Sequence, residues 1–426
     1  MDENQKLKRA TYNLWIMVTS NFISSFGSQI YAFAISYSIL HLTGSAVNFA
    51  TNLFFSVIPR LIASPFAGYV TDRFSRKQII VLSHLITIAT ILMLLGFSLT
   101  TGLTLPVIYA GTFIFSLVAT FSDIGFSSSI SGLIDEERIQ RGISLNQMVD
   151  SIAAITSPMI GGILYVLVSI SVFLVIYLVG TAIVTVLLLT MTFNLFTNTE
   201  FSEEEAKDRS MLASFKEGIA YGKRKPIIVC IISVAFMANF FVGSFQVGFS
   251  YILIDLLEVP SNHFGLVQGG FAAGMLVFSF YLSIRKEIRY PLIVTKYCLI
   301  VMAVAMAVFS LPLHTPFHYS IMIGYFVFLT FVLGGFIILI NTPIGVMMQK
   351  TVDDAYKGRV FSIMSIGAQS LMPFSLILYG FLYDFLPATP ILIISGLLLI
   401  LATLYVIRPD IIKRAHPEYV AEKEME

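Results

Sequence analysis

Long apolar runs separated by short polar segments make up most of this chain. A helix rises about 1.5 Å per residue, so about 20 apolar residues cross the roughly 30 Å hydrocarbon core of a bilayer. By this measure the sequence predicts an all-α membrane protein with twelve transmembrane helices. We expect these spans at residues 12–40, 46–69, 78–99, 106–131, 143–168, 171–195, 227–255, 264–284, 291–311, 318–347, 359–383 and 389–408. The first run is longer than the apolar part of a signal peptide, about 7–15 residues, so we expect it to remain in the protein.

One polar stretch, residues 198–226, is much longer than the other connections and divides the predicted spans into two groups of six. An equal division of this kind is typical of transporters built from two repeated halves. The sequence therefore predicts two six-helix lobes that form a pseudo-repeat. We expect an N-terminal lobe at 1–197, a cytoplasmic linker at 198–226, a C-terminal lobe at 227–408 and a cytoplasmic tail at 409–426.

Composition narrows the class of protein further. Hydrophobic residues make up 57% of the chain and charged residues 12%, whereas soluble domains carry about 25% charged residues. The two cysteines, Cys230 and Cys298, both lie in apolar runs, which argues against a disulfide framework or a cysteine-based metal site. No catalytic constellation or phosphate-binding loop occurs in a suitable setting. We therefore expect no enzymatic activity, no metal, no cofactor and no nucleic-acid partner.

The charged residues are distributed unevenly although the net charge is only +1. Every Lys and Arg except Arg60 and Lys296 falls in the N-terminus, the C-terminal tail or a connection on the same predicted side of the membrane. Basic residues next to spans stay on the cytoplasmic side. The pattern therefore predicts that both termini are cytoplasmic.

The connection between the second and third predicted spans carries a compact charged motif. Residues 68–77 read Gly-Tyr-Val-Thr-Asp-Arg-Phe-Ser-Arg-Lys. This pattern resembles the loop 2–3 signature of the major facilitator superfamily of secondary transporters, with Ser75 where the family usually has Gly. The resemblance implies a conformational latch. Its residues would be Gly68, Asp72, Arg73, Arg76 and Lys77, with Asp123 as a buried partner of the arginines and Arg359 at the contact with span 11.

Asp123 and Asp150 lie well inside predicted spans, where an ionisable group is costly and is often functional. Asp123 lies on a polar face of span 4 and Asp150 on a polar face of span 5. Burial and a nearby second carboxylate both favour the protonated form, so the pair is a candidate for proton coupling. The alternative is structural: Asp123 pairs with Arg73 or Arg76, and Asp150 bonds across helices. We expect Asp150 to carry the proton and Asp123 to serve mainly as a gate.

Residues 157–162 in span 5 read Ser-Pro-Met-Ile-Gly-Gly. They resemble the end of the antiporter signature of drug exporters, with Ser157 in place of the first Gly. Pro158 kinks a helix, and Gly161 and Gly162 let a neighbouring helix approach closely. An ordinary packing kink is the alternative interpretation.

Amides, hydroxyls and aromatic rings inside the spans are candidates for binding a large, mostly apolar substrate through a few hydrogen bonds. Arg60 is either a contact for a substrate anion or a gate residue. For the aromatic residues, lipid contact or helix packing is the alternative. The candidate substrate-binding residues are Asn21, Gln29, Arg60, Asn239, Phe240, Gln246 and Asn341.

Residues 357–362 read Lys-Gly-Arg-Val-Phe-Ser, and residues 358–384 continue with Pro373 and Gly380. Together with the motifs above, this segment resembles the macrolide-efflux and enterobactin-exporter branch of the superfamily. The resemblance implies a monomeric cell-membrane transporter that exports an amphipathic, macrolide-like molecule by proton antiport and alternating access, driven by the proton gradient. A siderophore or metabolite exporter is the first alternative. A nutrient importer or a non-transporting membrane sensor is less well supported.

Overall fold

The computed structural model describes residues 3–193, 195–196, 220–285, 288–315, 317–352, 360 and 370–419. Within these residues the regular structure is entirely helical. Tertiary contacts divide the chain into two compact units. One is Met1–Phe201 with Val259–Gly269, and the other is Ser202–Glu258 with Gly270–Glu426. The predicted lobe and linker boundaries stay predictions.

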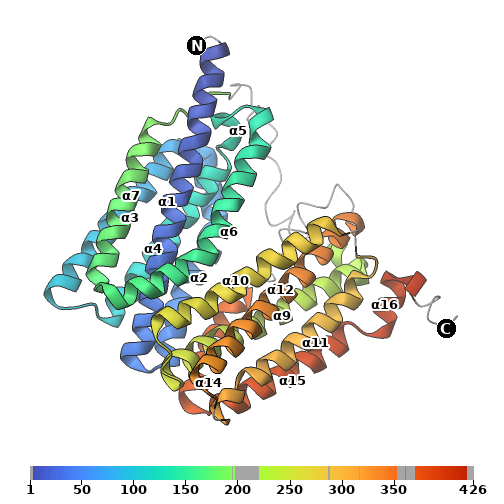
Figure 1. Ribbon diagram of the computed structural model, residues 1–426. Coiled ribbons are helices and arrows are strands. Elements are labelled where there is room, and N and C mark those ends of the chain that lie inside the picture. The colour runs from blue at the N-terminus through green and yellow to red at the C-terminus, as the bar shows by residue number, and fades with distance from the viewer. Residues whose placement is uncertain are drawn as a thin grey trace. The chain divides into compact units, whose positions relative to one another are not determined.

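In the first unit, long helices pack side by side (Figure 1). Its helices are α1 (Glu3–Thr43), α2 (Ala46–Arg73), α3 (Arg76–Thr100), α4 (Leu105–Ser127), α5 (Ile130–Leu133), α6 (Glu136–Leu167) and α7 (Ile170–Thr190). Helix α1 packs against α6 and α7, α2 packs against α4, and α3 packs against both α4 and α7. Segments far apart in the sequence therefore surround a common interior.

The second unit is also built from packed helices. They are α9 (Pro226–Tyr251), the π-helical turn η1 (Ile252–Leu256), α10 (Ser261–Ile284), α11 (Pro291–Phe309), the 3₁₀ turn η2 (Leu311–Leu313), α12 (Tyr319–Thr351), α14 (Met372–Phe385), α15 (Ala388–Val406) and α16 (Pro409–Ala415). Helix α9 packs against α14 and α15, and α11 packs against α12 and α15. The first residues of α10, up to Gly269, are grouped with the first unit.

The all-helical membrane fold is confirmed. Ten helices in the described part of the chain are long and apolar enough to span a bilayer. Helix α14 is apolar but has only 14 residues, and α1, with 41 residues, carries many polar side chains. The predicted span at 359–383 lies partly outside the described residues. The total of twelve spans therefore stays a prediction.

Basic side chains fix the end of α7 in the first unit. The last carbonyls of a helix lack intrahelical partners and carry partial negative charge. Arg9 Nη2 donates to the Thr190 carbonyl at 2.5 Å, and Lys77 Nζ donates to the carbonyls of Leu189 at 2.7 Å and Met191 at 2.9 Å. These contacts hold the starts of α1 and α3 at the end of α7.

An apolar cluster lies just inside these contacts. Met17 of α1, Ile80 of α3 and Val184 of α7 are among its members, and each is at most 1% exposed. The side chains of three separate helices thus meet at one level of the unit. Polar residues that line a cavity lie one turn further along each of these three helices, so the cluster positions them.

Candidate substrate and coupling site

A cavity of about 720 Å³ opens in the first unit. Its walls come from α1, α2, α3, α4, α6 and α7, so every long helix of the unit contributes. Five residues singled out from the sequence line it together: Asn21, Gln29, Arg60, Asp123 and Asp150. They belong to four helices, and Asn21 and Asp150 are 129 residues apart in the chain. Only folding brings them together.

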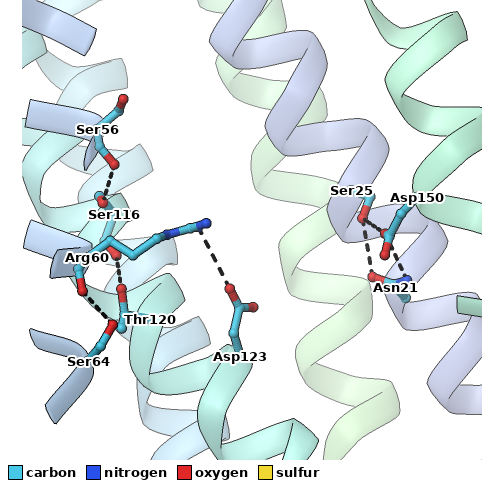
Figure 2. A network of polar contacts seen from close by, with 9 residues as sticks. All are labelled: Asn21, Ser25, Ser56, Arg60, Ser64, Ser116, Thr120, Asp123 and Asp150. Carbon is cyan, nitrogen blue, oxygen red and sulfur yellow. Dashed lines mark hydrogen bonds and ion pairs between the residues drawn. The ribbon is translucent and has the colours of Figure 1, made fainter. Parts of the chain in front are cut away.

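One wall of the cavity carries an ion pair. Arg60 Nη2 of α2 lies 3.7 Å from Asp123 Oδ2 of α4. Figure 2 shows the arginine side chain extending from its helix toward the carboxylate. The two side chains are 56% and 69% exposed, so both face open space rather than the packed interior. The pair compensates charge while remaining accessible to a small molecule.

Beside this ion pair, one hydroxyl group joins α4 to α2 and a second is bonded within α4. Ser116 Oγ of α4 donates to the Ser56 carbonyl of α2 at 2.6 Å, and Thr120 Oγ1 donates to the Ser116 carbonyl at 2.8 Å. Much of the polar face of α4 seen in the sequence thus serves helix packing. Asp123 is the ionisable residue on that face, and its side chain lines the cavity.

Asp150 of α6 lies in a different setting, grouped with two residues of α1 (Figure 2). Its Oδ1 accepts hydrogen bonds from Asn21 Nδ2 at 3.1 Å and Ser25 Oγ at 3.0 Å. Within the described part of the chain, no Lys, Arg or His lies within ion-pair distance of it. The two cavity carboxylates therefore differ: Asp123 has a cationic partner, whereas Asp150 has neutral donors.

The latch motif is placed only in part. Arg76 Nη1 donates to the Ser128 carbonyl at the end of α4, and Lys77 binds the end of α7 as described above. The predicted pairing of Asp123 with Arg76 is therefore not formed, because Arg60 occupies the position beside this carboxylate. Gly68, Asp72 and Arg73 fall in the last turns of α2, with side chains outside the described part, and Arg359 lies outside the described residues altogether.

The antiporter-like motif lies inside α6, with Pro158 in the helix interior. A Cβ added at Gly161 would come within 3.0 Å of the Phe33 ring, and one at Gly162 within 2.3 Å of the Ser261 carbonyl oxygen. Ser261 Oγ also donates to the Gly162 carbonyl at 2.9 Å. Ser157 is fully buried, and its hydroxyl has no hydrogen-bond partner in the described part of the chain. Gly162 thus permits a close backbone contact within the first unit, and Gly161 leaves room for the Phe33 ring.

The remaining candidates belong to the second unit. Asn239 on α9 donates to its own helix at the Ala235 carbonyl, 2.9 Å away, and Phe240 packs against Phe241 and Tyr379 with ring centroids 5.4 and 5.7 Å apart. Gln246 on α9 is half-buried and Asn341 on α12 is exposed. The contacts of Asn239 and Phe240 are those of helix packing, and a substrate role for all four stays a prediction.

The cavity also contains polar residues that the sequence analysis did not single out. Ser83, His84 and Thr87 of α3 line it, as do Tyr177 and Thr181 of α7. A possible signal was present, since Ser83 and Thr87 are four residues apart and lie on one helical face in a strongly apolar span. Apolar helices often carry such hydroxyls bonded to their own backbone, so the pattern alone did not identify a cavity wall.

The arrangement is that of a polytopic membrane protein with a polar, accessible cavity inside a helical unit. The sequence profile described as Major Facilitator Superfamily matches residues 17–375. The chain therefore belongs to the major facilitator superfamily. It is a multi-pass membrane transporter of the kind that handles small-molecule substrates.

Two relatives are distant in sequence but match over nearly the whole chain. Macrolide efflux protein A of Streptococcus pyogenes is 21% identical over 405 residues, covering 94% of this chain and 96% of the relative. The uncharacterized MFS-type transporter YfiS of Bacillus subtilis (strain 168) is 24% identical over 407 residues, covering 93% and 92%. These matches agree with the resemblance to macrolide efflux proteins found in the sequence.

Solved structures show the same fold. A bacterial homologue of the iron transporter ferroportin in its inward-facing state aligns with a TM-score of 0.69 at 16% identity, covering 93% of this chain and 98% of that chain. A D-xylose-proton symporter aligns with a TM-score of 0.67 at 13% identity, covering 93% and 97%. At these identities the likeness concerns the fold alone.

Proposed function

We propose that this protein exports an amphipathic, macrolide-like small molecule across the plasma membrane in exchange for protons, by alternating access. The observation that carries the proposal is the setting of Asp150. It is a carboxylate in a substrate-sized cavity whose partners are two neutral donors on another helix. The distant relatives named macrolide efflux protein A support the substrate class and the direction.

The physical argument concerns how a proton is gained and lost. Asn21 and Ser25 of α1 both donate hydrogen bonds to the Asp150 carboxylate of α6, so this acid joins the two helices. In the proposed cycle, a movement of α1 relative to α6 breaks these hydrogen bonds and accompanies proton uptake at Asp150. Proton binding at Asp150 is thereby linked to a helix movement, which is the requirement for coupled transport.

Asp123 is suited to a different task. Its pair with Arg60 joins α2 to α4 and keeps one charge of each sign in the cavity. We assign this pair to gating. The proton gradient is the driving force, and the transport cycle uses no cofactor. The protein acts as a monomer with both termini in the cytoplasm.

One observation favours the alternative of an anionic substrate such as a siderophore. The Arg60 side chain is 56% exposed toward the cavity, so its guanidinium is able to contact a ligand carboxylate or catecholate. Transport of the two substrate classes is expected to depend on Arg60 to different degrees. Loss of Arg60 abolishes uptake of an anionic siderophore but only weakens uptake of a macrolide.

The test uses inverted membrane vesicles with an acidified interior. Uptake of labelled macrolide, lipophilic cation and siderophore is measured for the wild type, Asp150→Asn, Arg60→Gln and Asp72→Asn. Asp410→Asn, on α16 of the second unit, is the matched control for loss of a carboxylate. We expect macrolide uptake by the wild type and the control, and none above empty vesicles for Asp150→Asn.

Two results contradict the proposal in different ways. Gradient-driven uptake by Asp150→Asn at the wild-type rate shows that another group carries the proton. If no compound accumulates in wild-type vesicles under any gradient, the assignment of an exporter is wrong.

A further inference from the structure

The cavity reaches beyond the acidic residues, to a wall where α1, α3 and α7 come together. Ser20, His84 and Thr181 line it there, one from each helix. None of the three carries a fixed charge, and the proposed coupling mechanism uses none of them. Their position relative to one another follows from the packing beneath them.

The apolar cluster described above sets that position. Met17, Ile80 and Val184 pack together in it. Ser20 follows Met17 by three residues, His84 follows Ile80 by four, and Thr181 precedes Val184 by three. Residues three or four apart lie on the same face of a helix. The three polar side chains therefore form the next layer on the same three helix faces, above an apolar floor.

Two of these groups have no hydrogen-bond partner in the described part of the chain. Ser20 is 4% exposed, and its hydroxyl has no hydrogen-bond partner in the described part of the chain. His84 lines the cavity and likewise makes no hydrogen bond within those residues. A buried polar group without a partner costs free energy, about 1–3 kcal/mol in measured cases. A water or a ligand in the adjoining cavity is a candidate for the missing partner.

Thr181 contributes differently. Its hydroxyl proton is used within α7, where Oγ1 donates to the Tyr177 carbonyl at 2.8 Å. The same oxygen keeps a lone pair for accepting a hydrogen bond. Serine offers a donor and an acceptor, and a neutral imidazole offers one of each. The layer as a whole therefore matches a group that both donates and accepts.

We propose that Ser20, His84 and Thr181 form a neutral polar subsite that binds a hydroxyl group of the transported molecule. The inference rests on the proposed export of amphipathic molecules and adds a specificity element to it. The Arg60–Asp123 pair and Asp150 handle charge, whereas this subsite selects substrates that carry a hydroxyl at a fixed distance from their charged or apolar part. Methylating that hydroxyl removes the donor and adds bulk, so the subsite discriminates against the ether.

The experiment compares one labelled macrolide with derivatives of the same macrolide in which single hydroxyls are O-methylated. Binding to purified protein and uptake into inverted vesicles are measured for the wild type, Ser20→Ala, His84→Ala and His84→Gln. Thr90→Val is the matched control, because Thr90 is a buried α3 residue that bonds its own helix at 2.8 Å and does not line the cavity.

We expect His84→Ala and Ser20→Ala each to raise the Kd and KM for the parent macrolide about 2- to 10-fold, the range for one hydrogen bond. For one O-methyl derivative, we expect the Kd and KM of the wild type to be raised by a similar factor. The two alanine variants are expected to raise the Kd and KM for that derivative little further. His84→Gln keeps a donor and an acceptor and restores part of the affinity. Thr90→Val binds and transports as the wild type does.

Other outcomes separate this inference from the proposed function. Equal losses for the parent and every derivative mean that His84 and Ser20 support the fold only, and this overturns the subsite. Unchanged Kd and KM in both alanine variants overturn it as well. Wild-type protein that binds the parent but shows no gradient-driven uptake contradicts proton antiport while leaving the subsite in place. Wild-type protein that binds none of the compounds overturns both.

Discussion

At the scale of single residues, the site is defined by how each charge is compensated. Asp123 and Asp150 look alike in the sequence, each an acid in an apolar span with hydroxyls at helical spacing. The structure gives Asp123 an arginine and Asp150 an amide and a hydroxyl. This difference in partners is the basis for the roles we propose, gating for Asp123 and proton transfer for Asp150.

Gly162 provides a prediction about packing. A methyl group at this position would lie 2.3 Å from the backbone oxygen of Ser261, which cannot rotate away. We expect Gly162→Ala to destabilise the protein by about 1–3 kcal/mol, the usual cost of overpacking. Thermal denaturation in detergent measures the change.

The control for this prediction is Gly96→Ala. Gly96 lies within α3, and apart from the adjoining residues and backbone of its own helix no atom lies within 4 Å of the position a Cβ would take there. Alanine is the better helix former by about 1 kcal/mol, so this variant is expected to be as stable as the wild type or slightly more stable. If both variants melt alike, close packing at Gly162 is not required.

At the scale of helices, a few buried polar side chains join elements that the sequence separates widely. Asn13 is an example: it is fully buried on α1, and its Nδ2 donates to the carbonyls of Leu133 and Thr192, each at 2.9 Å. The Thr192 N–H donates back to Asn13 Oδ1 at 3.3 Å. One side chain thus connects α1 to α5 and to the end of α7.

Replacement of Asn13 tests that connection. Asn13→Leu leaves buried backbone groups without partners, and we expect a loss of about 1–3 kcal/mol in the free energy of unfolding. Thr11→Val is the control, since Thr11 is exposed and bonds only within α1, to the Leu7 carbonyl. Melting temperatures that fall equally in both variants contradict the assigned role.

His416 links α16 to the start of α11 in the second unit. The Leu292 N–H donates to His416 Nε2 at 3.4 Å, which requires that nitrogen to be unprotonated. The Tyr290 ring packs edge-on against the His416 ring and also contacts the Tyr419 ring. Arg289 and Glu418, which neighbour these residues in the sequence, form an ion pair at 3.0 Å. Burial lowers the pKa of His416 below its ordinary value.

This shift gives stability a definite dependence on pH. The unfolded chain has the higher pKa, about 6.5, so it binds a proton at a pH where the folded protein does not. The contribution of His416 is therefore complete above about pH 6.5 and is lost as the pH falls below that value. We expect the melting temperature of the wild type to fall more between pH 7.5 and 5.5 than that of His416→Gln. Identical pH profiles for the two proteins contradict this prediction.

At the scale of the whole molecule, the charge distribution predicts which ends of the helices face the cytoplasm. Phe74, between α2 and α3, is expected on the cytoplasmic side, and Thr101, between α3 and α4, on the external side. Both residues are exposed, and both native cysteines are buried. Single cysteines at these two positions are therefore suitable reporters.

A membrane-impermeant maleimide tests the orientation in intact cells. We expect Thr101→Cys to be labelled and Phe74→Cys to be labelled only after the cells are permeabilised, because the reagent does not cross the bilayer. The wild type, with its buried cysteines, gives the background. Labelling of Phe74→Cys alone in intact cells means that the predicted orientation is reversed.

The sequence by itself determined the helical membrane fold and the residues able to carry charge into the membrane. This follows from local physics: in lipid the backbone must satisfy its own hydrogen bonds and the side chains must be apolar, so every span leaves a readable run of residues. Asn21, Gln29, Arg60, Asp123 and Asp150 were identifiable for the same reason, as polar exceptions within such runs. The resemblance to the major facilitator superfamily supplied the interpretation of the charged motif at residues 68–77 and the expected transport mechanism.

Only the tertiary structure decided which of these residues meet. The pairing of Asp123 with Arg60 instead of Arg76, and the placement of His84 in a cavity wall, depend on the rotation of each helix and on its neighbours. The length and hydropathy of an apolar run do not encode that rotation. It is set by packing among distant segments, such as the contact of Met17, Ile80 and Val184, which no single stretch of sequence contains.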